Sequence, residues 1–243
     1  MVEHIHGKDE VPGSIPGLGS SNLIKTVKIF WHLYVRNPIL FVGQAITNWA
    51  VVGSIFPTSA PLRRAVIAAG IGRQKDLNLV IIHGVGSGEF VYELLRQAHE
   101  QGLAIKNIVA MDVNAKFTAS ATALLPKIAK RYPSRTKVTF EKMDALDTTQ
   151  YLARRKWGKA DLVIGAIPYS ILPEQLDAWA KVYGEVTRRF VYYTYLPIFK
   201  QAKHKVAMRT FAHELGKHFE SVHEHARVLA NIPPAKVISA ENL

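Results

Sequence analysis

The chain has 243 residues, 48% of them hydrophobic, which is enough for one large domain with a packed core. Lys and Arg number 31 against 19 Asp and Glu, and the formal net charge of +12 favours an anionic partner, either nucleic acid or an acidic membrane surface. The chain contains no cysteine, which excludes disulfides and thiolate metal sites.

Residues 1–21 are polar, contain several Gly, Pro and Ser, and lack the apolar core of a signal peptide, so we expect a disordered tail. Residues 22–77 are predicted to form N-terminal helices that face a membrane or the substrate. The helix predicted at 22–37 carries a basic stripe that includes Arg36, beside the aromatic side chains of Trp31 and Tyr34. Such a helix suits a membrane interface, and packing of the helix on the domain is an equally good interpretation.

From residue 78 onward, short apolar segments alternate with amphipathic ones, as in a parallel sheet covered by helices on both faces. The last two predicted strands, 219–229 and 235–239, are joined by too few residues for a parallel crossover, so they should pair antiparallel. We therefore predict an α/β fold for residues 78–243. It is a mostly parallel seven-stranded sheet that ends in an antiparallel hairpin, which is the pattern of the Rossmann-like class I methyltransferases.

The turn that follows the first of these strands contains Gly84, Gly86 and Gly88. Glycines let the backbone approach a ligand closely, and a helix N-terminus attracts negative groups. A dinucleotide fingerprint would have glycine at position 89, where this chain has Glu89. The spacing instead resembles the first motif of S-adenosylmethionine enzymes, where the turn faces the methionine portion. A tight structural turn is the alternative interpretation.

Two acids follow the next two predicted strands. Asp112, followed by Val113, can accept hydrogen bonds from ribose hydroxyls, and Asp144, followed by Ala145, can accept one from the adenine amino group. Either acid could instead cap a helix. Because both stand at strand ends, as the glycine turn does, we predict binding of S-adenosyl-L-methionine, with Ala166 after the fourth strand also at the cofactor.

His83 stands before the first glycine, where S-adenosylmethionine enzymes usually carry Glu or Asp. We include His83 among the cofactor-binding residues. A protonated imidazole would repel the sulfonium and ammonium groups of the cofactor, so we expect weak or pH-sensitive affinity.

Tyrosines follow the fourth predicted strand and lie on the fifth. An amine acceptor becomes a cation on methylation, and aromatic faces stabilise cations. Tyr169 and Tyr195 are therefore the candidate catalytic residues, and Tyr193 should share one strand face with Tyr195. Packing of these rings in the core is the alternative. The segment IGAIPYSI is similar to the N-[IL]-P-[YF] motif of ribosomal RNA adenine dimethyltransferases, but Ala166 replaces the asparagine that holds the adenine amine.

A second resemblance covers residues 36 to 235. The segments RNP at 36–38, VGSIFPTS at 52–59, AIP at 166–168 with LP at 172–173, and NIPPA at 231–235 resemble motifs of the bacterial phospholipid N-methyltransferase family. This family methylates phosphatidylethanolamine. The resemblance and the position of the aromatic residues assign to the substrate Trp31, Tyr34, Arg36, Thr58, Ser59, Pro168 and Tyr193.

The resemblance implies methyl transfer from S-adenosyl-L-methionine to phosphatidylethanolamine and its methylated derivatives, towards phosphatidylcholine. It also implies a cytoplasmic enzyme that associates peripherally with the inner face of the cell membrane, with anionic lipid as its partner. A nucleic-acid adenine N6-methyltransferase is the runner-up, and a non-catalytic lipid- or RNA-binding protein is the third alternative. We expect no metal, because His213 and His218 are five residues apart instead of the four that face one ion.

Overall fold

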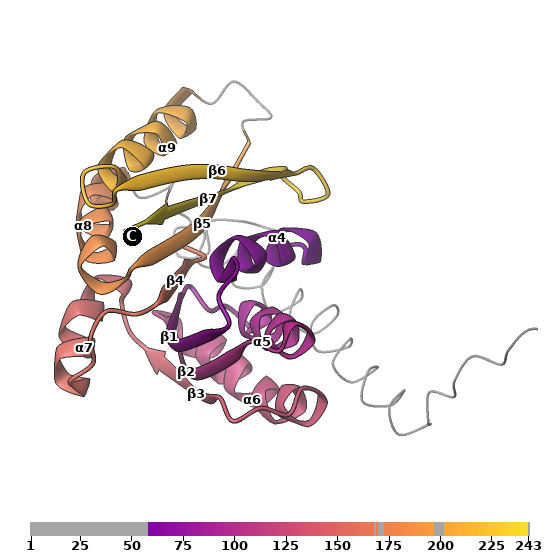
Figure 1. The fold of residues 1–243 in the computed structure, drawn as a ribbon. Helices are drawn as coiled ribbons and strands as arrows, with labels where there is room; N and C mark the ends of the chain where they lie inside the picture. Colours follow the sequence, from indigo (N-terminus) through magenta and orange to yellow (C-terminus); the bar gives the residue numbers. More distant parts are fainter. Residues whose placement is uncertain (1–57, 168, 170–172, 197–201, 243) are drawn as a thin grey trace, which may run out of the picture.

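The computed structural model of the chain describes residues 58–167, 169, 173–196 and 202–242 (Figure 1). The predictions made for residues 1–57, including Trp31, Tyr34 and Arg36, lie outside the described residues, as does Pro168.

Seven strands form one sheet in the order β3-β2-β1-β4-β5-β7-β6. Strands β1 to β5 pair in parallel, whereas β7 runs antiparallel to both β5 and β6. This confirms the predicted mostly parallel sheet with its antiparallel terminal hairpin. The strands are β1 (Asp76–His83), β2 (Ala104–Asp112), β3 (Lys137–Lys142), β4 (Leu162–Gly165), β5 (Arg189–Tyr195), β6 (Ser221–Val228) and β7 (Ala235–Glu241).

Helices cover both faces of this sheet (Figure 1). Side chains alternate along a strand, so Val80 and Ile82 of β1 pack on one face and Leu79 and Ile81 on the other. Helices α4 (Ala60–Ile71), α5 (Glu89–Gln101) and α6 (Ala115–Arg131) supply the first face. The second face is supplied by α7 (Thr148–Arg155), α8 (Leu176–Val186) and α9 (Ala202–Leu215).

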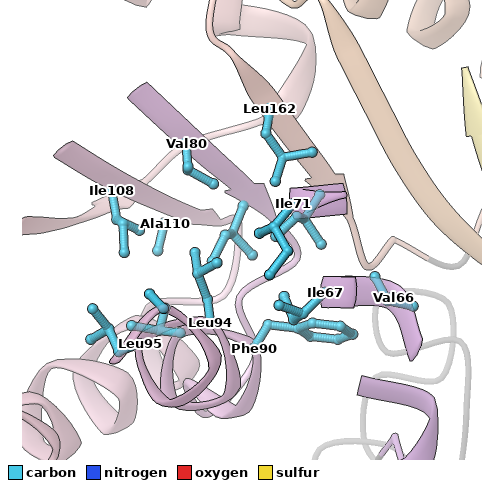
Figure 2. Close-up of a cluster of buried hydrophobic side chains, with 14 of the residues drawn as sticks. Val66, Ile67, Ile71, Val80, Phe90, Leu94, Leu95, Ile108, Ala110 and Leu162 are labelled. Carbon is cyan, nitrogen blue, oxygen red and sulfur yellow. The ribbon is translucent and has the colours of Figure 1, made fainter. Parts of the chain in front are cut away.

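Helix α4 is packed into the first of these two cores. Its Val66, Ile67 and Ile71 are at most 1% exposed, and Figure 2 shows them close to Leu162 of β4 and Phe90 of α5. Ser59 is the N-cap and a proline follows in the first turn, which together define where the helix begins. The described part of the N-terminal region is therefore continuous with the core of the sheet.

Helix α4 is oriented so that its N-terminus lies at the edge of the sheet where the parallel strands end. Its C-terminal end lies beside the start of β5, where Arg189 Nη1 donates to the carbonyl of Gly70 at 3.2 Å. Its N-terminal end lies beside the β6–β7 turn, since the N–H of Ser59 donates to Asn231 Oδ1 at 2.9 Å. Loops after parallel strands meet at this carboxyl edge, where open α/β sheets bind ligands.

Candidate cofactor and acceptor site

The glycine turn between β1 and α5 needs glycine for two different reasons. Gly84, Gly86 and Gly88 all have positive φ, at 73°, 54° and 97°. A Cβ on Gly84 would lie 2.8 Å from the carbonyl oxygen of Ala166, and one on Gly88 would lie 3.2 Å from Cα of Ala121. A Cβ on Gly86 would have one neighbour, a side-chain oxygen at 3.7 Å. The outer glycines therefore pack closely against β4 and α6, and the middle one leaves room for a ligand.

Asp112 fixes this turn against the end of β2. Its Oδ2 accepts the N–H of Gly86 at 3.0 Å, and its Oδ1 accepts the N–H of Asn114 at 2.8 Å. The side chain is nearly buried, and burial raises the pKa of Asp112 above its usual value, against the lowering effect of the two N–H donors. Each carboxylate oxygen has a second lone pair, so Asp112 can also accept hydrogen bonds from a ligand.

Asp144 and its neighbours lie after β3. Asp144 is exposed and caps the short 3-10 helix Ala145–Asp147, with Oδ1 accepting the N–H of Leu146 at 2.9 Å. The capping interpretation therefore accounts for one oxygen of Asp144, and the other oxygen remains able to accept. Val113, after β2, is 49% exposed, whereas Ala145 is buried.

The imidazole of His83 lies in the core, in a chain of hydrogen bonds. Its Nε2 is 2.9 Å from Thr148 Oγ1, and that hydroxyl donates to the carbonyl of Ala145 at 2.7 Å. Thr148 must then accept from Nε2–H, which leaves Nδ1 as an acceptor. The Tyr183 hydroxyl stands 3.4 Å from Nδ1 and itself lies 2.8 Å from the hydroxyl of Tyr169.

This burial removes the physical reason for the pH-sensitive cofactor affinity expected above. The His83 side chain is 0% exposed, and desolvation lowers its pKa from 6.5 to about 3. The imidazole is therefore neutral at ordinary pH. Only its main chain takes part in the turn, where its carbonyl accepts the N–H of Ala166 at 2.8 Å.

Tyr169 also lies in the core. Its ring is 2% exposed, stacks on Phe211 of α9 with centroids 4.6 Å apart, and meets Trp179 of α8 edge-on. Burial raises the pKa of Tyr169 well above its usual value. A Cβ on Gly165 would come 2.1 Å from the Tyr169 hydroxyl, so glycine at position 165 lets this ring fold back over β4. The structure gives Tyr169 a packing role, and its contact with an acceptor stays a prediction.

Tyr193 and Tyr195 share the opposite face of the sheet, the one that α4 and α5 cover. Their ring centroids are 5.8 Å apart, which confirms the predicted alternation along β5. The Tyr193 hydroxyl is 3.0 Å from Thr58 Oγ1, and its ring stacks on Phe90 in the first turn of α5 with centroids 6.2 Å apart. This pair of tyrosines therefore stands beside the helix that the glycine turn begins, whereas Tyr169 is separated from it by the sheet.

Three sequence segments far apart in the chain meet at this place. Ser59 donates its N–H to Asn231, which is 2% exposed, and Asn231 Nδ2 donates to the carbonyl of Pro233 at 2.6 Å. The N–H of Leu196 donates to the carbonyl of Pro234 at 2.6 Å. Residues 58–59, 193–196 and 231–234 thus form one structural unit at the carboxyl edge.

Arg63 is a site residue that the sequence analysis missed. Its side chain is only 4% exposed, Nη1 donates to the carbonyl of Thr58, and Nε has no hydrogen-bond partner among the described residues. The sequence feature that could have identified Arg63 is its position in the apolar stripe of α4, between Leu62 and Val66, where a solvated arginine is not expected.

Comparison with solved structures shows the same fold in known methyltransferases. An O-methyltransferase from Bacillus cereus, solved with SAH, matches with a TM-score of 0.57 and 11% identity over 88% of this chain and 96% of that chain. The small RNA methyltransferase HEN1 matches with a TM-score of 0.57 and 15% identity over 76% of this chain and 26% of that chain. The bifunctional kinase-methyltransferase WbdD matches with a TM-score of 0.50 and 15% identity over 74% of this chain.

At these low identities the structural matches show a shared fold alone, which is the Rossmann-like class I methyltransferase fold. The chain spans 38% of the length of WbdD, so that protein's activities are not transferred to it. No protein-family model and no curated protein matches the sequence. Across the described ranges, no helix is long and apolar enough to cross a membrane, and no group of three or more side chains is arranged to hold a metal ion.

The buried His83 makes stability depend on pH. The unfolded chain takes up a proton at this residue below about pH 6.5, whereas the folded chain does not do so until about pH 3. Stability from this residue is complete above the higher value and is lost as the pH falls. Between pH 7 and pH 5 the loss should be about 2 kcal/mol of unfolding free energy, and the His83→Gln variant should not show it.

Urea unfolding at the two pH values measures this difference. The His223→Gln variant is the control, because His223 is exposed on β6, and it should keep the pH dependence of the unsubstituted chain. An equal pH dependence in the chain with and without His83 would contradict the burial of a neutral imidazole.

Proposed function

We propose that the chain is an S-adenosyl-L-methionine-dependent N-methyltransferase that acts on the amine headgroup of a phospholipid at a membrane surface. Phosphatidylethanolamine and its methylated derivatives are the proposed substrates. One observation carries the proposal: the helix that follows the glycine turn held by Asp112 packs on Tyr193, which lies with Tyr195 on one face of the sheet, and aromatic faces stabilise the cation formed when an amine is methylated. The shared fold with an O-methyltransferase that was solved with SAH supports the methyl-donor half of the proposal.

The residues at the strand ends fit the proposed cofactor. The open side of Gly86 and the N-terminus of α5 suit the methionine portion, whose carboxylate is attracted by free N–H groups. Asp112 retains acceptor capacity for ribose hydroxyls, and exposed Asp144 has an oxygen for the adenine amino group. When bound, S-adenosyl-L-methionine supplies an activated methyl group on a sulfonium, so the protein has to align the acceptor and needs no strong base.

The acceptor amine is proposed to lie against Tyr193 and Tyr195. A neutral amine attacks the methyl group, and the product nitrogen becomes positively charged, which an aromatic face stabilises by about 0.5–2 kcal/mol. Burial raises the pKa of Tyr193 well above its usual value, so this hydroxyl remains protonated and hydrogen-bonded to Thr58. The two tyrosines therefore orient and shield the amine, and its proton leaves to solvent.

Two exposed apolar side chains could contact lipid at the carboxyl edge of the sheet, near the proposed acceptor site. Leu229 is 73% exposed and Ile232 is 69% exposed, and both flank buried Asn231 in the β6–β7 turn. This turn is joined to the N-terminus of α4 through Ser59. Apolar side chains at this edge can enter a membrane interface, and the net charge of +12 favours an anionic leaflet. Trp31, Tyr34, Arg36 and Pro168 remain proposed substrate contacts.

Transfer to a nucleic-acid adenine is the second candidate, supported by the IPY segment and by the fold shared with HEN1. Two observations favour the lipid. Ala166 has no side-chain amide to hold an adenine amine, and the Tyr169 ring that would stack on the base is enclosed between Phe211 and Trp179. A base cannot stack on a face that another ring already covers.

The charge of Asp112 should matter for cofactor binding. The Asp112→Asn variant loses charge-assisted hydrogen bonds to ribose, so we expect affinity for S-adenosyl-L-methionine to fall by roughly 10- to 100-fold, as measured by calorimetry. Asp161→Asn is the matched control, because Asp161 also accepts two backbone N–H groups, from Asn78 and Leu79, at the opposite edge of the sheet. Equal losses of affinity in both variants would indicate a general effect on the fold and contradict the assignment.

The acceptor can be identified by supplying the full chain with methyl-labelled cofactor and either phosphatidylethanolamine vesicles or total RNA. We expect label in the lipid. A Leu229→Ser and Ile232→Ser double variant should label vesicles several-fold more slowly, because it loses apolar contact with the membrane, and should label soluble glycerophosphoethanolamine at the unsubstituted rate. Label in RNA would establish the second candidate, and label in neither pool would favour a binding protein.

A further inference from the structure

The guanidinium of Arg63 is a buried cation that has no anionic partner among the residues the structure describes. No carboxylate of the described residues forms an ion pair with it, and Glu93 and Glu100 of the adjacent helix α5 pair with Arg96 instead. Its Nε is buried and has no hydrogen-bond partner in the described ranges. Buried charges in proteins are normally paired, because an isolated one costs several kcal/mol. This arrangement points to an anionic ligand.

The N-terminus of α4 adds to the positive potential at the same place. The helix has 12 residues, no acidic residue in its first turn, and Arg63 within that turn. The positive end of the helix dipole and the guanidinium therefore act together on any group that lies at the carboxyl edge. The N–H groups of Leu62 and Arg63 already donate to Ser59, so the hydrogen bonds to a ligand would come from the guanidinium. A guanidinium suits a phosphate, since it can donate two parallel hydrogen bonds to it.

Thr58 connects Arg63 to the tyrosines that are proposed to contact the acceptor amine. Its carbonyl accepts from Arg63 Nη1, and its hydroxyl is 3.0 Å from the Tyr193 hydroxyl. Thr58 therefore contacts both the Arg63 guanidinium and the Tyr193 hydroxyl. In an ethanolamine phospholipid, two carbons separate the amine from the phosphodiester oxygen. A headgroup with its amine on the tyrosines would therefore have its phosphate within the reach of a neighbouring residue such as Arg63.

We propose that the Arg63 guanidinium, aided by the positive end of the α4 dipole, forms a phosphate subsite, which binds the phosphodiester of the headgroup while Tyr193 and Tyr195 contact its amine. The identification of the ligand as a lipid rests on the proposed function. The chemistry of the subsite does not, because a free phosphate presents the same oxygen atoms. The subsite makes the enzyme select amines that carry a phosphodiester over amines that do not.

Binding of three soluble probes to the full chain tests the subsite: glycerophosphoethanolamine, inorganic phosphate and ethanolamine. We compare Arg63→Gln, which removes the charge, with Arg63→Lys, which keeps the charge but loses the planar fork. Arg64→Gln is the matched control, since Arg64 is the next residue of α4 and is exposed. Calorimetry should show glycerophosphoethanolamine binding weakened at least tenfold by Arg63→Gln, less by Arg63→Lys, and unchanged by Arg64→Gln. Ethanolamine binding should be unchanged in all three.

A measurement on the unsubstituted chain covers the case in which Arg63→Gln does not fold. In nitrogen-15-labelled protein, the Arg63 Nε–H resonance should shift when glycerophosphoethanolamine is added, with the Arg63→Lys variant identifying the signal. Inorganic phosphate that produces the same shift supports a subsite for phosphate in general, whereas a shift with the phosphodiester alone supports a headgroup subsite. Absence of any shift, or equal weakening of binding by the Arg63 and Arg64 substitutions, overturns the subsite.

A methyl-transfer assay with the same variants distinguishes failure of the phosphate subsite from failure of the proposed function. If binding depends on Arg63 but no label reaches vesicles, the proposed function fails and the subsite stands. If phosphatidylethanolamine vesicles are labelled with the same KM and kcat by Arg63→Gln and by Arg64→Gln, the function stands and the subsite is overturned.

Discussion

The carboxylate of Asp112 is the interaction on which the arrangement at the carboxyl edge depends. By accepting N–H groups from Gly86 and from Asn114, it joins the glycine turn after β1 to the loop after β2. The turn also requires close approach, because Gly84 lies against the backbone of Ala166 and Gly88 lies against α6. A Cβ on Gly84 would clash with that backbone, and one on Gly88 would require Ala121 to shift by a few tenths of an ångström. The position of the turn is therefore set by the hydrogen bond to Asp112 and by close packing against Ala166 and against α6.

The sheet divides the polar groups at this edge into two sets with different roles. On the α7–α9 face, a buried hydrogen-bonded chain connects the end of β1, the start of α7, helix α8 and the loop after β4; its members are His83, Thr148, Tyr183 and Tyr169. On the α4–α5 face, Tyr193 and Tyr195 lie beside Thr58 and the first turn of α5. The first set has its hydrogen bonds and ring faces occupied within the protein. The second set lies close to Arg63, whose Nε has no hydrogen-bond partner within the described part of the chain.

Much of the fold could be predicted from the sequence because its signals are local. The continuous apolar residues of the parallel strands indicated burial on both faces. The short link between β6 and β7 was enough to predict an antiparallel pair. The glycine turn and Asp112 could be assigned because they stand at strand ends, where the topology of the sheet brings them together.

The side-chain environments at the site could not be predicted in the same way. Whether Tyr169 faces a ligand or the core depends on how its loop folds back over Gly165, which is not a local property of the sequence. The contact between Ser59 and Asn231 joins residues 172 positions apart. Arg63 lies in the apolar stripe of α4, but its burial and its contacts depend on how α4 packs on the sheet, which is also not a local property of the sequence.

A crystal structure of the full chain with SAH tests the central claim most directly, which is that the strand-end loops hold a methyl donor next to the tyrosine pair. The account predicts the ligand at the carboxyl edge, with its ribose hydroxyls on Asp112, its amino-acid portion at Gly86, and its sulfur directed towards Tyr193 and Tyr195. A ligand whose sulfur faces the Tyr169 side of the sheet, or a site that remains empty at saturating SAH, would contradict it.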